Sequence, residues 1–302
     1  MMIDMENLED VISETAFELL HRAATKLPRD VKTALSRAYN EEKIETGKAQ
    51  LKAILENIDI AEKCDTSMCQ DTGVPLFFIT WGLKSGLTID LKKPLAKATQ
   101  RATKEVPLRP NVIHPLTNEN PGTNVGWDMP YIYYDLEPEQ DYLEITAMPK
   151  GFGSEAKSSL VFIVTSESMP EAITRCVIDN ALTSLGETCP PTIVGLGIGG
   201  TADIALHIAK KAILRSPIGS PNPRPEVAKL ERTVLNALNR TGLGPMAMGG
   251  DTTSLAVHAE ICGTHTAVAP VAISYQCWAA RRSTAKIYPD GKVQYITHPD
   301  GS

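Results

Sequence analysis

The six cysteines of this 302-residue chain constrain its fold more than any other feature of the sequence. They run from Cys64 to Cys277, and none stands in a Cys-x-x-Cys pair. The sequence therefore does not support a zinc ribbon or a ferredoxin-type cluster site, and no disulfide framework is expected in a cytosolic chain of this size. A hydrophobic core must hold the fold together. A hydrophobic fraction of 42% and a charged fraction of 22% are typical of globular proteins.

Charge and hydropathy exclude several classes of function. A net charge of −6 with scattered basic residues disfavours nucleic acid, which needs a clustered basic surface. Residues 1–27 are charged throughout and lack the apolar region of a signal peptide. No apolar run approaches the roughly 20 residues that span a bilayer. The sequence therefore predicts a cytoplasmic protein that binds neither nucleic acid nor a membrane.

The residue pattern predicts a mixed α+β fold, in which N-terminal helices precede a mixed sheet with packed helices. We expect one domain over residues 1–302, with residues 1–60 as its helical N-terminal part and Pro28 separating two helices. Polar loops are expected at 109–129 and 217–225, and a hairpin turn at 289–292. Strands are predicted at 75–81, 87–91, 131–136, 142–147, 160–165, 192–196 and 266–275, and helices at 95–106, 170–185, 201–214 and 225–240.

Three of the cysteines stand where a loop meets a structured element. Cys69 precedes a predicted strand, Cys189 lies between a helix and a strand, and Cys277 ends a strand. Three thiolates can hold three irons of a cubane cluster, which leaves the fourth iron open as a Lewis acid. The other three cysteines lack such surroundings and are interpreted as ordinary thiols; they are Cys64, Cys176 and Cys262.

Five segments of the sequence are similar to those of a known family. They begin at Cys69-Gln-Asp-Thr-Gly, Lys150-Gly-Phe-Gly-Ser-Glu-Ala-Lys, Cys189-Pro-Pro-Thr-Ile-Val-Gly, Gly249-Gly-Asp-Thr-Thr and Cys277-Trp-Ala-Ala-Arg. These segments resemble the class I fumarases, and more closely the α subunit of the two-subunit fumarate hydratase and L-tartrate dehydratase family. The resemblance runs from about residue 40 to the end, with the five motifs in the family's order.

The resemblance implies a [4Fe–4S] cluster and an active site around it. Three cysteines match the family's cluster ligands, namely Cys69, Cys189 and Cys277. The implied catalytic residues are Asp71 and His265, and the implied substrate-binding residues are Gln70, Asp71, Arg109, Gly153 and Lys157. An open iron would polarise the substrate C–O bond, Asp71 could assist proton removal from carbon, and arginines would clamp the carboxylates.

The implied activity is reversible hydration of a small dicarboxylate by an iron–sulfur hydro-lyase. The segments at 150–157 and 249–253 look more like fumarases, which favours fumarate and (S)-malate. The Cys277-Trp278 pair looks more like tartrate dehydratases, so L(+)-tartrate is the alternative substrate. Single-chain family members carry a further C-terminal catalytic domain. This sequence ends at Ser302 without it, so the resemblance implies a β subunit and an (αβ)2 assembly.

Other interpretations of the same residues stay open at this point. Residues 195–200 fit a Gly-x-Gly-x-x-Gly dinucleotide motif, but the acidic residue expected about 20 positions later is missing. The glycines could instead bind a carboxylate or allow tight packing. Asp71 could be a turn residue, His265 a satisfied polar residue, and Arg281-Arg282 a solvated pair. A non-catalytic iron–sulfur sensor or scaffold is the alternative of another class, although it would not need Arg109 and Lys157.

Overall fold

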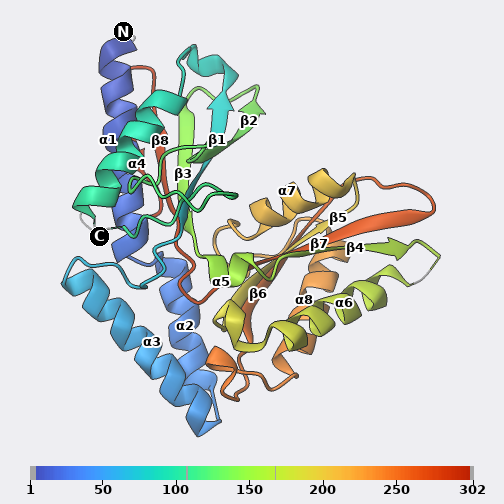
Figure 1. Cartoon of the computed structure of the whole chain (residues 1–302). Helices are drawn as coiled ribbons and strands as arrows, with labels where there is room; N and C mark the ends of the chain where they lie inside the picture. The colour runs from blue at the N-terminus through green and yellow to red at the C-terminus, as the bar shows by residue number, and fades with distance from the viewer. Residues whose placement is uncertain (1–4, 107, 167, 300–302) are drawn as a thin grey trace. The chain divides into compact units, whose positions relative to one another are not determined.

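The computed structural model describes residues 5–106, 108–166 and 168–299, which divide into two compact units (Figure 1). Unit 1 takes Met1–Arg29, Asn57–Gly151 and Arg281–Ser302, so far as these residues are described. Unit 2 takes Asp30–Glu56 and Phe152–Ala280. The chain therefore enters unit 2 twice, and the predicted helical stretch 1–60 contributes to both units.

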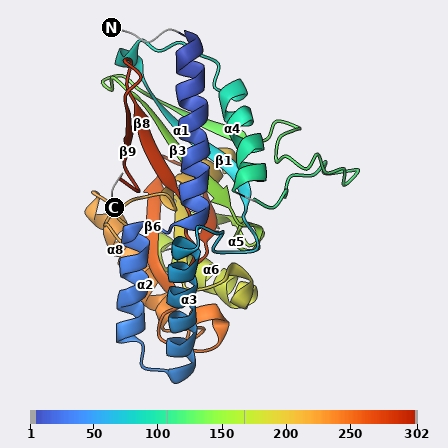
Figure 2. The same cartoon turned by 90° about the vertical axis from the view of Figure 1, so that its left-hand side faces the viewer.

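Unit 1 is built on a five-stranded sheet in the order β2-β1-β3-β8-β9. The β1–β2 pair is parallel, and the other neighbours are antiparallel. Helices α1 and α4 pack together beside this sheet (Figure 2). The elements are α1 (Met5–Thr25), β1 (Val74–Gly82), η1 (Leu83–Ser85), α4 (Lys92–Glu105), β2 (Tyr131–Glu137), β3 (Leu143–Lys150), β8 (Ser283–Ile287) and β9 (Val293–Tyr295).

The core of unit 1 follows from two matching periodicities. Alternate residues of β3 point to one face of the sheet, so Leu143, Ile145 and Ala147 are all fully buried. Helix α1 carries Ile12 and Leu19 on one stripe at helical spacing, and both belong to the same buried cluster. The apolar face of the helix is thus buried against the apolar face of the sheet.

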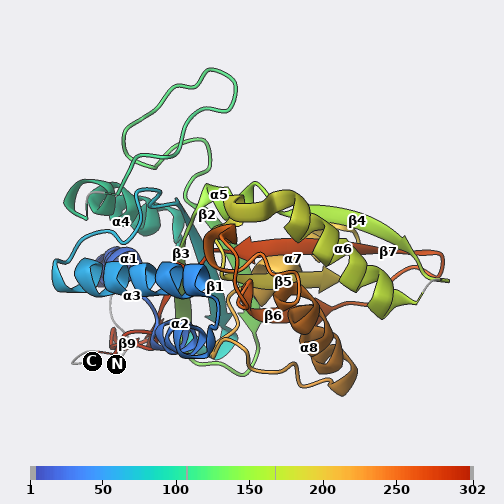
Figure 3. The ribbon, with the colours of Figure 1, turned by 90° about the horizontal axis from the view of Figure 1, so that it is seen from below.

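Unit 2 is built on a four-stranded sheet in the order β4-β7-β5-β6, in which β5 and β6 are parallel. Helices α6 and α8 lie side by side and bury their apolar faces in the main core of the unit (Figure 3). Helix α7 packs on β5 and β7. The elements are α2 (Arg29–Glu41), α3 (Glu45–Lys63), whose residues from Asn57 onward belong to unit 1, α5 (Phe152–Glu155), β4 (Ser159–Val164), α6 (Met169–Ser184), η2 (Leu185–Thr188), β5 (Thr192–Ile198), α7 (Ala202–Ala212), α8 (Pro225–Asn239), η3 (Pro245–Ala247), β6 (Ser254–Ile261) and β7 (Val268–Gln276).

The glycine-rich run of β5 serves the packing of α7. A Cβ atom on Gly195 would stand 2.3 Å from the carbonyl oxygen of Ala209, and one on Gly197 would stand 1.9 Å from that of Ala205. Both distances are far below van der Waals contact, so only glycine lets the helix approach this closely. The run therefore has a packing role, which was one of the alternatives to a dinucleotide motif.

The predicted α+β class is confirmed, as are most of the predicted elements. Residues 87–91 form no strand: Leu87 and Leu91 are apolar because they are buried in the core of unit 1. Strand β6 was missed, since its buried run carries no alternation to separate strand from helix. The N-terminal region holds three helices where two were expected.

The buried ring of His298 in unit 1 predicts a pH-dependent stability. Burial lowers the pKa of His298 from 6.5 to about 4; a backbone hydrogen bond with Arg282 opposes this shift, and the positive charges of Arg22, Lys26 and Arg282 add to it. Below pH 6.5 the unfolded chain binds a proton that the folded chain does not, so stability is lost as the pH falls from about 6.5 to about 4. We expect His298 to lower the free energy of unfolding by about 2 kcal/mol between pH 7.5 and pH 5.

The measurement is the free energy of unfolding of the apo chain in denaturant at both pH values. His298→Gln should remove this part of the pH dependence. His21→Gln is the control. The hydrogen bond to Glu18 raises the pKa of His21, so protonation of His21 stabilises the folded chain as the pH falls, which is the opposite of the effect of His298. An unchanged pH dependence in the His298→Gln protein would contradict the prediction.

Candidate active site

In unit 1, hydrogen bonds fix Asp71 at both its side chain and its backbone. Its Oδ1 accepts hydrogen bonds from the Gly73 backbone N–H at 3.0 Å and from Asn111 Nδ2 at 3.2 Å. Its carbonyl oxygen accepts a bond of 2.8 Å from Arg281 Nη1. Asp71 therefore makes the turn that the sequence allowed, and the same turn holds its carboxylate in one orientation. The neighbouring Gln70 is exposed.

The predicted polar loop after α4 is anchored at its base next to this aspartate. The Arg109 backbone N–H donates to Thr72 Oγ1 at 2.9 Å. Buried Asn124 accepts the N–H groups of Asn111 and Val112 at 2.7 and 3.1 Å, and its Nδ2 donates to the Arg109 carbonyl at 3.0 Å. The backbone at Arg109 is thus held while its side chain is exposed. An exposed, anchored cation suits recognition of a carboxylate.

Two buried cations that the sequence did not reveal lie in this part of unit 1, Arg281 beside Asp71 and Lys150 at the end of β3. Arg281 is only 2% exposed and Lys150 only 1%. Lys150 Nζ donates to the Gly151 carbonyl at 3.2 Å. A Cβ atom on Gly151 would lie 3.1 Å from Arg281 Nη2 and 3.4 Å from Asp71 Oδ2, so these groups converge on the bare glycine. The interpretation of Arg281-Arg282 as a solvated pair is wrong, since Arg282 is also buried.

In unit 2, the structure brings Cys189 and Cys277 next to each other. Cys189 follows η2 in a left-handed conformation, with φ of 51° and ψ of 66°. Its carbonyl accepts a hydrogen bond of 3.1 Å from the backbone N–H of Trp278, which follows Cys277 directly. Both cysteines are half-buried, and none of the six cysteines forms a disulfide. The backbone segments that carry the two cysteines are therefore in contact.

Cys69, the third predicted ligand, belongs to unit 1 and is half-buried. Among the described residues, no three His, Cys, Asp or Glu side chains are gathered into a metal-binding group. The three-cysteine ligand set accordingly stays a prediction.

The glycine-rich loop after Gly151 packs against the segment that leads to Cys189. Lys157 Nζ pairs with a Glu187 carboxylate oxygen at 2.8 Å. A Cβ atom on Gly153 would lie 2.8 Å from the Glu187 carbonyl oxygen, so the loop needs a glycine at this contact. Two predicted substrate-binding residues, Gly153 and Lys157, thus contact Glu187, which lies two positions before the predicted ligand Cys189.

The motif at 249–253 is held by a carboxylate that the sequence analysis did not single out. Glu42 is buried after α2 and accepts hydrogen bonds from the N–H groups of Lys43 and Ile44, both at 3.1 Å. It also accepts those of Asp251 at 2.9 Å and Thr252 at 3.2 Å. One buried carboxylate thereby satisfies four backbone donors and fixes the motif.

The short helix η3, which precedes this motif, contacts the segment that carries Cys189. The Met246 N–H in η3 donates to the Pro190 carbonyl at 2.9 Å, directly after Cys189. Met246 and Ala247 both have positive φ, of 54° and 56°. Such conformations are costly outside glycine, and they cluster where a structure positions functional groups.

His265 lies in an exposed loop that joins β6 to β7. Its Nδ1 accepts the Ala267 N–H at 3.1 Å. His265 precedes β7 and Cys277 follows it, and a nine-residue strand spans roughly 26 Å. Within unit 2, most of the positions between His265 and Cys277 belong to this extended strand, so the two residues lie near its opposite ends. The catalytic role of His265 stays a prediction that this unit by itself does not support.

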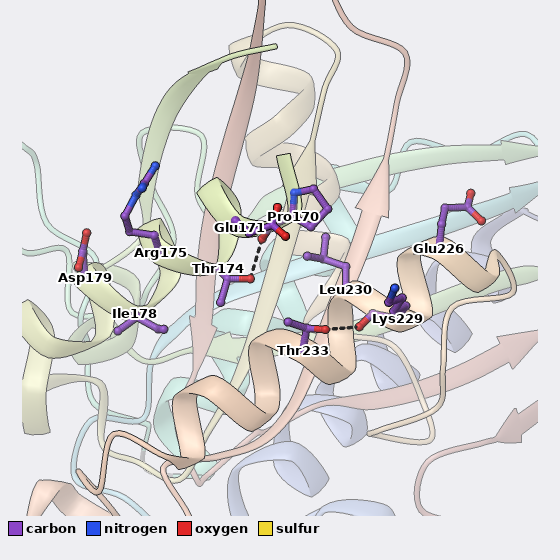
Figure 4. A pocket seen from close by; sticks show the side chains of 10 residues that line it. All are labelled: Pro170, Glu171, Thr174, Arg175, Ile178, Asp179, Glu226, Lys229, Leu230 and Thr233. Carbon is purple, nitrogen blue, oxygen red and sulfur yellow. Dashed lines mark hydrogen bonds between the residues drawn. The ribbon is translucent and has the colours of Figure 1, made fainter. Parts of the chain in front are cut away.

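A separate groove of 640 Å³ runs between α6 and α8 (Figure 4). Its lining mixes acidic and basic side chains, among them Glu171, Arg175 and Lys229. None of the predicted site residues lines it.

Comparison with known proteins shows the family of the chain. The family model described as fumarate hydratase (fumerase) matches residues 13–286. The chain belongs to the class I fumarate hydratase family. A relative from Methanocaldococcus jannaschii, named "Putative L(+)-tartrate dehydratase subunit alpha", is 46% identical over 93% of this chain and 99% of its own length. The L(+)-tartrate dehydratase subunit alpha of Escherichia coli strain K12 is 33% identical over 91% and 90%, respectively.

This membership confirms the resemblance and the prediction of a hydro-lyase of the class I fumarase type. It is also consistent with an iron–sulfur enzyme, and the relatives' designation as α subunits implies that such proteins work with a partner subunit. Within the described ranges of the chain, no helix is long and apolar enough to cross a bilayer.

Proposed function

We propose that this chain is the α subunit of a two-subunit [4Fe–4S] hydro-lyase that removes water from L(+)-tartrate. The observation that carries the proposal is similarity over nearly the full length of both chains to proteins named as α subunits of that enzyme. The Cys277-Trp278 pair points the same way. A cytoplasmic location stays a prediction of the sequence.

We assign the cluster to the thiolates of Cys69, Cys189 and Cys277. When bound, such a cluster would offer an open iron that polarises the C–O bond of the leaving hydroxyl. The residues of the chain itself supply the rest: Arg109 binds a substrate carboxylate, and Asp71 accepts or relays the proton that leaves carbon. Loss of water from tartrate gives the enol of oxaloacetate, so oxaloacetate is the expected product.

Fumarate and (S)-malate are the second candidate substrate pair. The segments at 150–157 and 249–253 favour it, because they look more like fumarases. The two candidates share the same carboxylate recognition and differ only in the second hydroxyl of tartrate. A single substrate comparison therefore separates them.

The test is to produce the chain anaerobically with its β subunit, and to assay L(+)-tartrate, (S)-malate and fumarate. We expect oxaloacetate from tartrate at a kcat/KM at least about tenfold above that for malate, a difference of about 1.4 kcal/mol in transition-state binding. The α chain assayed alone should be inactive and should regain turnover when the β chain is added. Preference for malate would select the second candidate, and full turnover without the β chain would refute the two-subunit proposal.

A further inference from the structure

We propose that Arg281 is a positioning residue that holds Asp71 in its working orientation. The proposal rests on the function proposed above, in which Asp71 handles the substrate proton. Arg281 is buried, and its Nη1 donates to the Asp71 carbonyl at 2.8 Å. A guanidinium is planar and carries several donors in a fixed fork, so one side chain can hold a carbonyl and approach a nearby carboxylate together.

The second arm of the guanidinium reaches the same place. Arg281 Nη2 and Asp71 Oδ2 both lie against Gly151, at 3.1 and 3.4 Å from the position of a Cβ atom there. Any side chain at residue 151 would intrude between the cation and the carboxylate. Gly151 therefore has a specific reason to lack a side chain, and the two opposite charges face the same small space.

Arg281 contacts a different atom of Asp71 from Gly73 and Asn111. Gly73 and Asn111 both donate to Oδ1 and so fix one carboxylate oxygen. Neither of them restrains the peptide group between residues 71 and 72, whose carbonyl Arg281 binds. Arg281 thus ties the Asp71 backbone to the segment that precedes β8.

The next residue provides a matched control. Arg282 is as buried as Arg281, but it lies close enough to His298 for its charge to act on that ring. Arg281 thus contacts Asp71, whereas the charge of Arg282 acts on His298. Arg281→Gln and Arg282→Gln remove the same buried charge from neighbouring positions, and only the first should affect Asp71.

The first readout needs neither cluster nor substrate. In the apo chain, hydrogen exchange of the backbone amides at residues 71–73 should rise at least about fivefold in Arg281→Gln and stay unchanged in Arg282→Gln. Arg281→Lys keeps a cation and should restore part of the protection, which also covers the case in which Arg281→Gln fails to fold. Equal exchange in all variants would overturn the proposal.

The second readout is kinetic and uses the α–β enzyme with the substrate that it turns over. Arg281→Gln should lower kcat about 10- to 100-fold with little change in KM, and Arg281→Lys should recover part of the loss. Because the effect acts through Asp71, Arg281→Gln should add little to Asp71→Asn. Losses that multiply in the double variant would overturn the proposal. If the wild-type enzyme hydrates or dehydrates none of the substrates, the proposed function fails, whereas the exchange experiment still decides the role of Arg281.

Discussion

Replacing Cys189 or Cys277 with serine is expected to abolish both iron binding and turnover, and replacing Cys69 should do the same. A thiolate is the ligand that iron–sulfur clusters require, whereas a serine hydroxyl stays protonated at neutral pH and binds iron poorly. In the structure, the backbone next to Cys277 contacts the backbone of Cys189, because the Trp278 N–H donates a hydrogen bond to the Cys189 carbonyl. We expect bound iron and sulfide to fall to background in each variant, measured after anaerobic reconstitution.

The remaining cysteines are the internal control for this prediction. Cys64 and Cys262 are exposed, and Cys176 is half-buried in α6. Serine at any of these positions should leave the iron content at the wild-type level and the activity within about twofold. If one of these changes removed the iron, the ligand assignment would be wrong, even if the Cys189 variant behaved as expected.

The features of the site that depend on nearby residues in the sequence could be predicted. Asp71 stands two residues before Gly73 in an Asx-turn pattern, and the structure contains this turn. The polar loop after α4 could also be predicted, because its Asn, Pro and Gly residues disfavour regular structure. These features depend on neighbours a few positions away.

Features that depend on tertiary packing could not be predicted in the same way. Adjacent arginines are usually solvated, and nothing next to Arg281 in the sequence shows that the sheet of unit 1 buries it beside Asp71. Glu42 is separated by over two hundred positions from the loop it caps. His265 and Cys277 are only twelve positions apart, but most of the intervening residues form the extended strand β7. Sequence distance carries no information about such arrangements until the strands are known.

Asp71→Asn is expected to lower kcat by about 10²- to 10⁴-fold while leaving the cluster in place. The amide oxygen of asparagine can still accept the N–H of Gly73 and the side-chain donor of Asn111, so the turn should persist. What disappears is the negative charge beside Arg281 and the ability to take a proton. The measurement is steady-state kinetics of the α–β enzyme together with its iron content, which should equal that of the wild type.

Arg109→Ala is expected to separate substrate binding from chemistry at the proposed site. The Arg109 backbone stays anchored through Thr72 and Asn124, so the substitution removes only the exposed guanidinium. We expect it to weaken dicarboxylate binding by about 2–4 kcal/mol, seen mainly as a higher KM. Arg101→Ala is the matched control, since that arginine is engaged by Glu14 and Glu105 on α1 and α4. Wild-type kinetics in both Asp71→Asn and Arg109→Ala would mean that the substrate binds elsewhere, because the two variants remove in turn the proposed proton acceptor and the proposed carboxylate-binding cation.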